Sequence, residues 1–232
     1  MSNFLFDIPA TPGVPVAGER RAYPVHRIFC VGRNYAAHAA EMGVAVDREA
    51  PFYFTKSPST ILLSGAAAPY PPGTQNFHYE MELVVAMGKP VFRASPAETA
   101  GAVFGYACGL DMTRRDLQLA AREKQRPWDL GKDVEQSAVI AAITHAAQVP
   151  EIGPQRIALS VNGEVKQDAH LSDLIHKVPE IIAHLSSFYH LVPGDLIYTG
   201  TPAGVGAVKP GDVIEGSIDG LAPVRLTIGD PE

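Results

Sequence analysis

Residues 78–85 read His78-Tyr79-Glu80-Met81-Glu82-Leu83-Val84-Val85 and place two carboxylates, two residues apart, at the head of an apolar run. Successive side chains of a strand point to opposite faces, so Glu80 and Glu82 share a face, with Cα atoms roughly 6.5–7 Å apart. Residues 83–87 are apolar on both faces, which predicts a strand buried on both sides. Unpaired charges are costly there, so the two acids need a counter-charge, and one small cation could bridge them.

A third acid, Asp111, ends another apolar run at residues 103–110, and a strand paired with the first would bring it to the same point. Three carboxylates with no nearby His or Cys cluster favour Mg²⁺ or Mn²⁺. Ca²⁺ ranks behind them because the sequence has no Asp-rich, Gly-centred twelve-residue loop. His78 is a further candidate ligand, although an imidazole at the wet end of a strand is more often solvated. The alternative interpretation is that Glu80 and Glu82 line the solvated face of an amphipathic strand.

Length and composition limit the classes of protein that the chain can belong to. Its 232 residues, 46% of them hydrophobic, are enough for one domain with a substantial core. The net charge of −6 and the lack of a basic cluster argue against a nucleic-acid surface. The N-terminal residues lack the features of a secretion signal, and no apolar run approaches the roughly 18–20 residues that span a bilayer. We therefore expect a cytoplasmic protein without a membrane partner, in which Cys30 and Cys108 are buried, reduced thiols.

The order of local patterns predicts an α+β chain that is mainly β. Residues 1–22 are rich in proline and have no periodic pattern, which predicts an N-terminal arm in front of one catalytic domain at 23–232. A strand is expected at 27–31, and a helix at 34–43 with Asn34 as its cap and Gly43 as its stop. Further short helices are expected at 96–100, capped by Ser95, at 114–123 and at 179–189. Most other segments are strand-like, with Pro-Gly-Asp turns at 193–195 and 210–212 and an Asn-Gly hairpin turn at 162–163.

The predicted helix after Gly32 carries a second candidate site. His38 and Glu41 stand at positions i and i+3, so the carboxylate can orient the imidazole as a general base. The alternative is an exposed polar pair on a surface helix. The glycine-rich segment 200–206 precedes a turn and not a helix, which excludes a dinucleotide fingerprint. The cations that merit attention, each in a segment that begins or ends at a strand, are Lys56, Arg115 and Lys132.

Taken in order, six segments closely resemble the fumarylacetoacetate hydrolase family. They are Val31-Gly32-Arg33-Asn34-Tyr35-Ala36-Ala37-His38-Ala39-Ala40-Glu41-Met42, Phe54-Thr55-Lys56, His78-Tyr79-Glu80-Met81-Glu82-Leu83, Asp111-Met112-Thr113-Arg114-Arg115-Asp116-Leu117-Gln118, Gly131-Lys132 and Tyr198-Thr199-Gly200-Thr201-Pro202-Ala203-Gly204-Val205-Gly206. The resemblance covers about residues 25–227. Within the family, the chain most resembles the bacterial fumarylpyruvate hydrolases and the acylpyruvate hydrolases. This resemblance implies the family's mixed β-sandwich roll with a few short helices, a bound Mg²⁺ or Mn²⁺, and a homodimer.

Position by position, the resemblance implies a role for ten residues. It makes Glu80, Glu82 and Asp111 the metal ligands, His38 and Glu41 the pair that activates water, and Lys132 the lysine near the metal. It places Arg115, Gln118, Lys56 and Thr201 on the substrate. The chain departs from the family pattern at residues 133–139, where relatives often have Phe and a later Pro, and this leaves the substrate's shape open.

These roles imply a hydrolase that cleaves the C–C bond of a 3-acylpyruvate, a small anionic 2,4-dioxo acid. The first candidate is fumarylpyruvate, an intermediate of gentisate-type aromatic catabolism, which would give fumarate and pyruvate. His38 would take a proton from the water that attacks C4, and the cation and Lys132 would stabilise the pyruvate enolate. Arg115 is the first choice to bind the far carboxylate, because its planar fork suits that group.

The sequence leaves two alternative functions open. One keeps the scaffold but acts as a decarboxylase, isomerase or hydratase of a 2-oxo acid such as oxaloacetate. The presence of the His38–Glu41 pair favours hydrolysis over decarboxylation, which needs no attacking water. The more distant rival is a non-enzymatic protein whose acids hold a structural ion.

Overall fold

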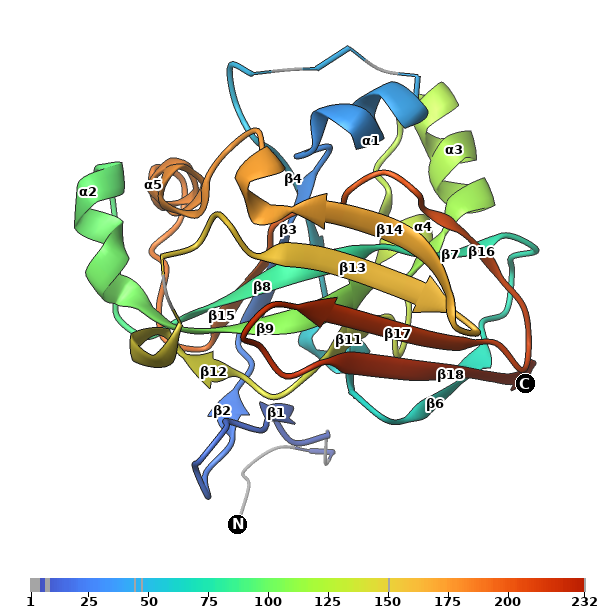
Figure 1. Ribbon diagram of the computed structural model, residues 1–232, viewed down its shortest axis with the longest axis horizontal. Helices are drawn as coiled ribbons and strands as arrows, with labels where there is room; N and C mark the ends of the chain where they lie inside the picture. Colours follow the sequence, from blue (N-terminus) through green and yellow to red (C-terminus); the bar gives the residue numbers. More distant parts are fainter. Residues whose placement is uncertain (1–4, 7–8, 44, 47, 150, 232) are drawn as a thin grey trace.

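Two large β-sheets pack face to face, and short helices lie around their edges (Figure 1). The computed structural model describes residues 5–6, 9–43, 45–46, 48–149 and 151–231. The fold is α+β and mainly β, with a curled mixed sheet, as the sequence predicts. Among the described residues, no helix combines the length and apolarity that crossing a membrane requires.

The larger sheet has the strand order β4-β3-β15-β8-β9-β11-β5, and β12 pairs with β9 beside this path. Its strands are β3 (Arg27–Gly32), β4 (Phe52–Lys56), β5 (Ile61–Leu63), β8 (Met81–Met87), β9 (Val103–Asp111), β11 (Ala138–Ile140), β12 (Thr144–His145) and β15 (Asp195–Tyr198). β15 runs parallel to β3, and β11 runs parallel to β5, while β8 and β9 are antiparallel. Every residue of β8 is buried, which confirms the prediction from its two apolar faces.

The second sheet has the strand order β14-β13-β17-β18-β6 and lies in front in Figure 1. Its strands are β6 (Ala67–Tyr70), β13 (Arg156–Val161), β14 (Glu164–His170), β17 (Val213–Ile218) and β18 (Val224–Pro231). Asn162 and Gly163 join β13 to β14 with φ angles of 51° and 82°, so the predicted two-residue hairpin turn is confirmed. Met81, Leu83 and Val85 of β8 share a core cluster with residues of this sheet.

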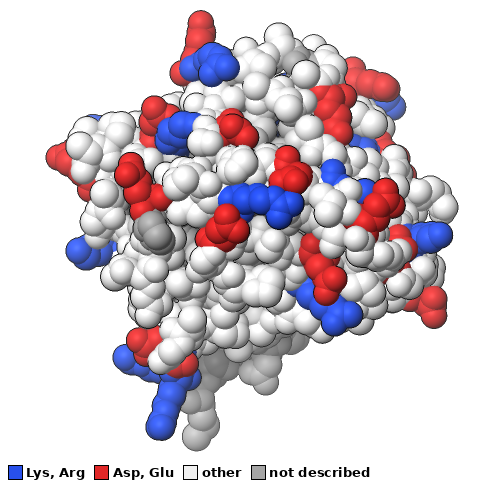
Figure 2. Space-filling view, in the orientation of Figure 1, with Lys and Arg blue, Asp and Glu red and all other residues white. Residues whose placement is uncertain are grey.

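Acidic and basic side chains alternate over the exposed face of the second sheet (Figure 2). Arg156 of β13 and Asp168 of β14, for example, form an ion pair of 2.7 Å there.

Two small sheets complete the described strands. One joins β10 (Thr113–Arg114), β7 (Phe77–Tyr79) and β16 (Gly206–Val208), and the other pairs β1 (Gly13–Val14) with β2 (Tyr23–Pro24). Val14 and Val16 are buried in the same cluster as Val84 of β8, so this part of the N-terminal arm packs on the larger sheet. The division between arm and domain after residue 22 stays a prediction.

The helices are short, as predicted. They are α1 (Ala36–Glu41), α2 (Pro96–Thr99), α3 (Arg115–Glu123), α4 (Asp129–Lys132) and α5 (Val178–Ser186), with 3-10 turns η1 (Pro58–Thr60), η2 (Ala100–Ala102), η3 (Ala146–Gln148) and η4 (Leu171–Asp173). Ser95 caps α2 in a capping box with Glu98, as expected. The sequence did not predict α4, and α5 ends before the expected Tyr189.

Asn34 does not cap α1, so that prediction was wrong. The cap is Tyr35, and the Asn34 amide instead donates to the carbonyls of His176 and Thr199, at 3.0 and 2.8 Å. Asn34 is buried and ties the start of α1 to two distant loops. Gly43 does adopt the expected left-handed conformation, with φ of 66°.

Candidate active site

Glu80 lies in a one-residue break between two strands. Residues 78–85 were predicted to form one continuous strand, but the chain leaves the small sheet with β7 and enters the large sheet with β8. The reason lies in the hydrogen bonds at the break, since the Met81 N–H donates to the side chain of Gln167 and the Glu80 carbonyl accepts from the Asp111 N–H. The break turns Glu80 into the same space as Glu82.

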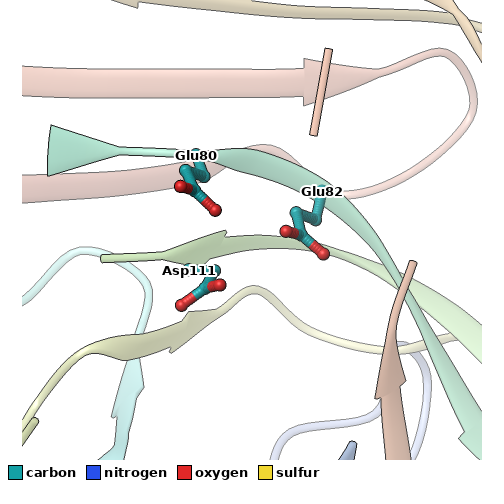
Figure 3. A group of neighbouring side chains, drawn as sticks. All are labelled: Glu80, Glu82 and Asp111. Atoms are coloured by element: carbon teal, nitrogen blue, oxygen red, sulfur yellow. The ribbon is translucent and has the colours of Figure 1, made fainter. Parts of the chain in front are cut away.

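The three predicted acids converge, because β8 pairs antiparallel with β9 and the pairing brings the end of β9 beside the start of β8. Their side chains point toward one another in Figure 3, and one oxygen from each lies within 4.8 Å of the others. Glu80 is 4% exposed, Glu82 1% and Asp111 0%. Among the described residues these three acids form the group that could hold a metal, and His78 is not a member of it.

The donor set fits a hard divalent cation. All three ligand groups are carboxylates, which suit Mg²⁺ or Mn²⁺. Asp111 Oδ1 is buried without a hydrogen-bond partner, although Lys56 Nζ lies 2.9 Å away, outside hydrogen-bond geometry. The Lys56 ammonium group already pairs with this oxygen, and a divalent cation would use its remaining lone pair.

Three cations surround the acids, namely Lys56, Arg115 and Lys132. Lys132, at the end of α4, donates from Nζ to Glu80 Oε2 at 2.8 Å and to Asp111 Oδ2 at 2.7 Å. The Arg115 guanidinium, at the start of α3, donates to Glu80 and to Gln118. These ion pairs join several separate segments of the chain. Lys132 was expected in a segment that begins or ends at a strand, but it lies on the short helix α4.

The two glutamates have opposite pKa shifts. Burial alone would raise the pKa of Glu80, but the charges of Lys132 and Arg115 outweigh it and hold that pKa well below its usual range. Burial and the negative charges of Asp111 and Glu80 raise the pKa of Glu82 well above its usual value. Lys132 has a raised pKa because Asp111 and Glu80 offset its burial. Glu82 is thus the acid that most lacks a compensating positive charge.

Glu82 is positioned by the loop after β15. The Gly200 N–H donates to Glu82 Oε2 at 2.7 Å. Gly200 has a φ of 99°, and a Cβ there would lie 2.7 Å from the Cβ of Asn34, so only glycine fits. Gly200, at the start of the glycine-rich segment 200–206, therefore positions one of the three acids.

His38 and Glu41 form the predicted pair on α1. His38 Nδ1 lies 3.0 Å from Glu41 Oε2, and the Gly204 N–H donates to Glu41 Oε1, also at 3.0 Å. His38 is buried, whereas the Glu41 side chain is 32% exposed. The carboxylate can therefore fix the imidazole while the imidazole faces inward.

One cavity collects most of the predicted residues. Its lining includes His38, Glu80, Glu82, Arg115, Gln118, Lys132 and Thr201. Thr201 Oγ1 accepts from the Gln167 amide at 2.8 Å, which fixes its position. Asp111 and Glu41 do not line this cavity but contact residues that do, Lys132 and His38.

Two further candidates lie elsewhere. Lys56 is buried behind the acids, where its Nζ donates to Ser137 Oγ at 2.7 Å and to the carbonyls of Met112 and Lys132. It does not line the cavity, so it can act on a substrate only through Asp111 and the backbone. His78 has a pKa lowered to about 4, first by burial and then by the charge of Arg115, and its Nε2 lies 2.8 Å from Asn76 Oδ1.

Several residues of the cavity had no predicted role. Arg33, Arg122, Phe54 and Trp128 line it, and Gln167 supports both Met81 and Thr201 from behind. Arg33 stands in the quoted segment after β3, and its non-glycine left-handed backbone, with φ of 59°, could not be read from the sequence. Arg122 lies in the last turn of the amphipathic helix α3, and the sequence pattern there does not indicate that its side chain lines a cavity.

A mainly β roll with buried carboxylates beside a His–Glu pair has the features of a metal-dependent hydrolase. The family described as fumarylacetoacetate (FAA) hydrolase, C-terminal, matches residues 27–229. The chain therefore belongs to the fumarylacetoacetate hydrolase family.

Three members of the family are similar to this chain over most of its length. Fumarylpyruvate hydrolase of Ralstonia sp is 56% identical over 193 residues, which cover 82% of this chain and 100% of the relative. The crystal structure of fumarylpyruvate hydrolase from Pseudomonas aeruginosa in complex with Mn²⁺ and pyruvate matches with a TM-score of 0.94 and 43% identity, covering 98% of this chain and 100% of that one. The mitochondrial oxaloacetate tautomerase of Homo sapiens is 40% identical over 205 residues, 88% of this chain and 92% of the relative.

Proposed function

We propose that this protein is a metal-dependent hydrolase that cleaves fumarylpyruvate to fumarate and pyruvate. The observation that carries the proposal is one cavity lined by two glutamates of a buried acid triad and by His38, in a chain 56% identical to a fumarylpyruvate hydrolase. Other 3-acylpyruvates share the 2,4-dioxo acid group and are the wider substrate class.

Glu80, Glu82 and Asp111 would hold Mg²⁺ or Mn²⁺, and the P. aeruginosa structure with Mn²⁺ and pyruvate supports this assignment. A bound divalent cation supplies the positive charge that holds a chelating 2-oxo acid and lowers the energy of negative charge developing on it. Lys132 adds a second positive charge beside Glu80 and Asp111.

The residues of the chain then account for the proton transfers. His38, oriented by Glu41, takes a proton from water as the water oxygen bonds to C4 of the substrate. The C3–C4 bond breaks, its electron pair stays on C3, and C4 becomes the new carboxyl carbon of fumarate. Protonation of C3 gives pyruvate, so the reaction consumes one water and needs no redox partner.

Arg115, Gln118 and Thr201 are the proposed contacts for the pyruvate half of the substrate. Arg115 and Gln118 are hydrogen-bonded to each other beside Glu80, at the acid end of the cavity. Lys56 would act indirectly, by fixing Asp111 and the backbone of Lys132.

A second candidate function is conversion of oxaloacetate on the same scaffold, by tautomerisation, another isomerisation, decarboxylation or hydration. The observation in its favour is the 40% identity with the human oxaloacetate tautomerase. The His38–Glu41 pair and the higher identity with the Ralstonia hydrolase favour hydrolysis. A purely structural ion is the weakest alternative, because Glu80 and Glu82 share their cavity with His38 and three arginines.

The biological setting follows from this assignment. We infer a cytoplasmic homodimer that acts on a small anionic dioxo acid in gentisate-type aromatic catabolism. The family resemblance supports the dimer, and the described aromatic side chains exposed beside the cavity agree with it.

One assay tests the proposal. The ultraviolet absorbance of fumarylpyruvate, maleylpyruvate, acetylpyruvate and oxaloacetate is followed with purified protein, with and without Mg²⁺. Rapid Mg²⁺-dependent loss of fumarylpyruvate, with fumarate and pyruvate as products, is the expected result. Turnover of oxaloacetate alone, or activity that survives exhaustive chelation, would contradict it.

A further inference from the structure

Two arginines stand between the acid cavity and a second, aromatic depression beside it. Arg33 and Arg122 line both spaces, together with Phe54, Trp128 and Lys132. Glu80 and Glu82 line only the first space, so the arginines lie on the side of the cavity that adjoins the second space.

The guanidinium of Arg33 is held by aromatic rings. Its Cζ lies 5.5 Å from the centre of the Trp128 ring and 5.7 Å from that of Phe52. The left-handed backbone of Arg33, with φ of 59°, is a costly conformation for a residue with a side chain. Packing and backbone therefore fix the position of a charge that faces the cavity.

Among the described residues, neither arginine has an acidic partner. Within the part of the chain that the structure describes, no carboxylate lies within 4.0 Å of either guanidinium, and Arg122 Nη1 makes one hydrogen bond, of 3.2 Å, to the carbonyl of Met42. Burial and then the positive charge of Arg122 lower the pKa of Arg33. Two half-buried like charges on one cavity wall leave a place where an anion would be stabilised.

Arg115 is placed differently, although it was the first choice for the far end of the substrate. Its guanidinium contacts Glu80 and Gln118, at the metal end of the cavity. A linear substrate would bind with its 2-oxo acid head at the cation that the acids hold. Its far carboxylate would then point away from Arg115.

We propose that Arg33 and Arg122 together bind the second carboxylate of a linear 2-oxo dicarboxylate. This deepens the proposed function, on which it rests, because fumarylpyruvate carries such a carboxylate at C7. The two arginines then select dicarboxylic substrates over acylpyruvates that end in an alkyl group.

The test uses two uncleavable ligands of equal chain length, 2-oxoheptanedioate and 2-oxoheptanoate. Both have the 2-oxo acid head, and only the first has the far carboxylate. With Mg²⁺ present, calorimetry on the wild type should show tighter binding of the diacid. Arg33→Gln and Arg122→Gln should each reduce this preference by about 10-fold or more and leave 2-oxoheptanoate unaffected, since charge-assisted hydrogen bonds have that magnitude.

Arg225→Gln is the matched control, because this exposed arginine of β18 lines neither the acid cavity nor the aromatic depression. It should leave the preference unchanged. Arg33 also packs on two rings, so Arg122→Gln decides the matter if Arg33→Gln does not fold. Equal binding of the two ligands by the wild type, an unchanged preference in the folded variants, or an equal loss for both ligands would overturn the inference.

Kinetics separate this inference from the proposed function. If the diacid preference depends on both arginines but fumarylpyruvate is not hydrolysed, the anion site stands and the proposed reaction fails. If fumarylpyruvate is hydrolysed and both Gln variants retain wild-type kcat/KM for it, the reaction stands and the anion site fails.

Discussion

His38 is the residue whose loss should separate catalysis from metal binding. It is 5% exposed, and its partner Glu41 lies 3.0 Å away, while the metal group is built from other residues. His38→Ala should lower kcat roughly 10²–10⁴-fold, the usual contribution of a general base. Calorimetry should show unchanged Mg²⁺ affinity. His145→Ala, outside the cavity and beside Glu19, is the control, and full activity of His38→Ala would refute the assigned base.

Glu82 should limit the stability of the protein when no metal is bound. It is buried beside two other carboxylates, which raise its pKa together with burial. Glu82→Gln keeps the shape and the acceptor for the Gly200 N–H but removes the repulsion. We expect the metal-free Tm to rise by about 2–4 °C, for a gain of about 1 kcal/mol. Thermal-shift curves should also show that Mg²⁺ no longer stabilises the variant, and an unchanged Mg²⁺ affinity would remove Glu82 from the ligand set.

The raised pKa of Glu82 also predicts a pH dependence of metal binding. The pKa of this carboxyl group is 4.5 for an ordinary glutamate and lies well above that value in the folded protein. At a pH between these two pKa values, the metal-free folded state therefore holds one proton that the unfolded state has lost. Metal-free stability should therefore fall as pH rises through this window. Mg²⁺ needs the ionised carboxylate, so binding should release this proton and strengthen by about tenfold per pH unit. Glu80, with its lowered pKa, is already ionised there. Calorimetry in buffers of different protonation enthalpy measures the release, and a buffer-independent enthalpy would contradict it.

At the scale of the elements, the sequence predicts what depends on local pattern. The buried strand after Glu82, the cap of Ser95 and the Asn162-Gly163 turn follow from side-chain alternation, capping and left-handed backbone. Asn34 was misassigned because its side chain has long-range partners, which a capping rule cannot see. The break at Glu80 depends on Gln167, 87 residues further on, for the same reason.

The loop after β15 holds Glu41 at the end of α1 in place, and this contact can be tested by mutation. Gly204 has a φ of 96°, its N–H donates to Glu41, and a Cβ would overlap the carbonyl oxygen of Lys166. Gly204→Ala should therefore cost about 2–4 kcal/mol of stability and also lower kcat by displacing Glu41. Gly211→Ala is the matched control, with a φ of 90° but no atom within 4 Å of the added Cβ. It should cost only about 1 kcal/mol and leave kcat unchanged. Urea denaturation and steady-state kinetics compare the two variants, and equal costs would mean that the overlap is relieved.

At the scale of the whole molecule, the site exists because two layers and several loops meet at one edge. Its acids come from β8, β9 and the break before β8, its cations from β4, the end of β3, α3 and α4, and its candidate base, His38, from α1. The residue types and their spacing predicted that the three acids converge and that His38 pairs with Glu41, while their catalytic roles stay predictions. The Arg33–Arg122 pair could not be predicted, because it arises only when the end of β3 meets the outer face of α3.

The molecule also exposes an aromatic surface that a second copy should cover. Phe52, Phe188 and Tyr189 are 44%, 68% and 44% exposed and line one depression with Trp128 and Tyr53. Exposed apolar clusters of this kind mark interaction sites in soluble proteins, and the family resemblance indicates a homodimer. Light scattering after size exclusion should give twice the mass of the chain.

Phe188→Asp should shift this equilibrium toward the monomer, because it places a charge in the apolar contact. Val165→Asp, equally drastic but on the exposed edge strand β14, should leave the dimer intact. Since the same depression adjoins Arg33 and Arg122, the monomeric variant should also bind the diacid ligand more weakly. A wild-type monomer at all concentrations, or a Phe188→Asp dimer of unchanged affinity, would show that this aromatic surface has another role.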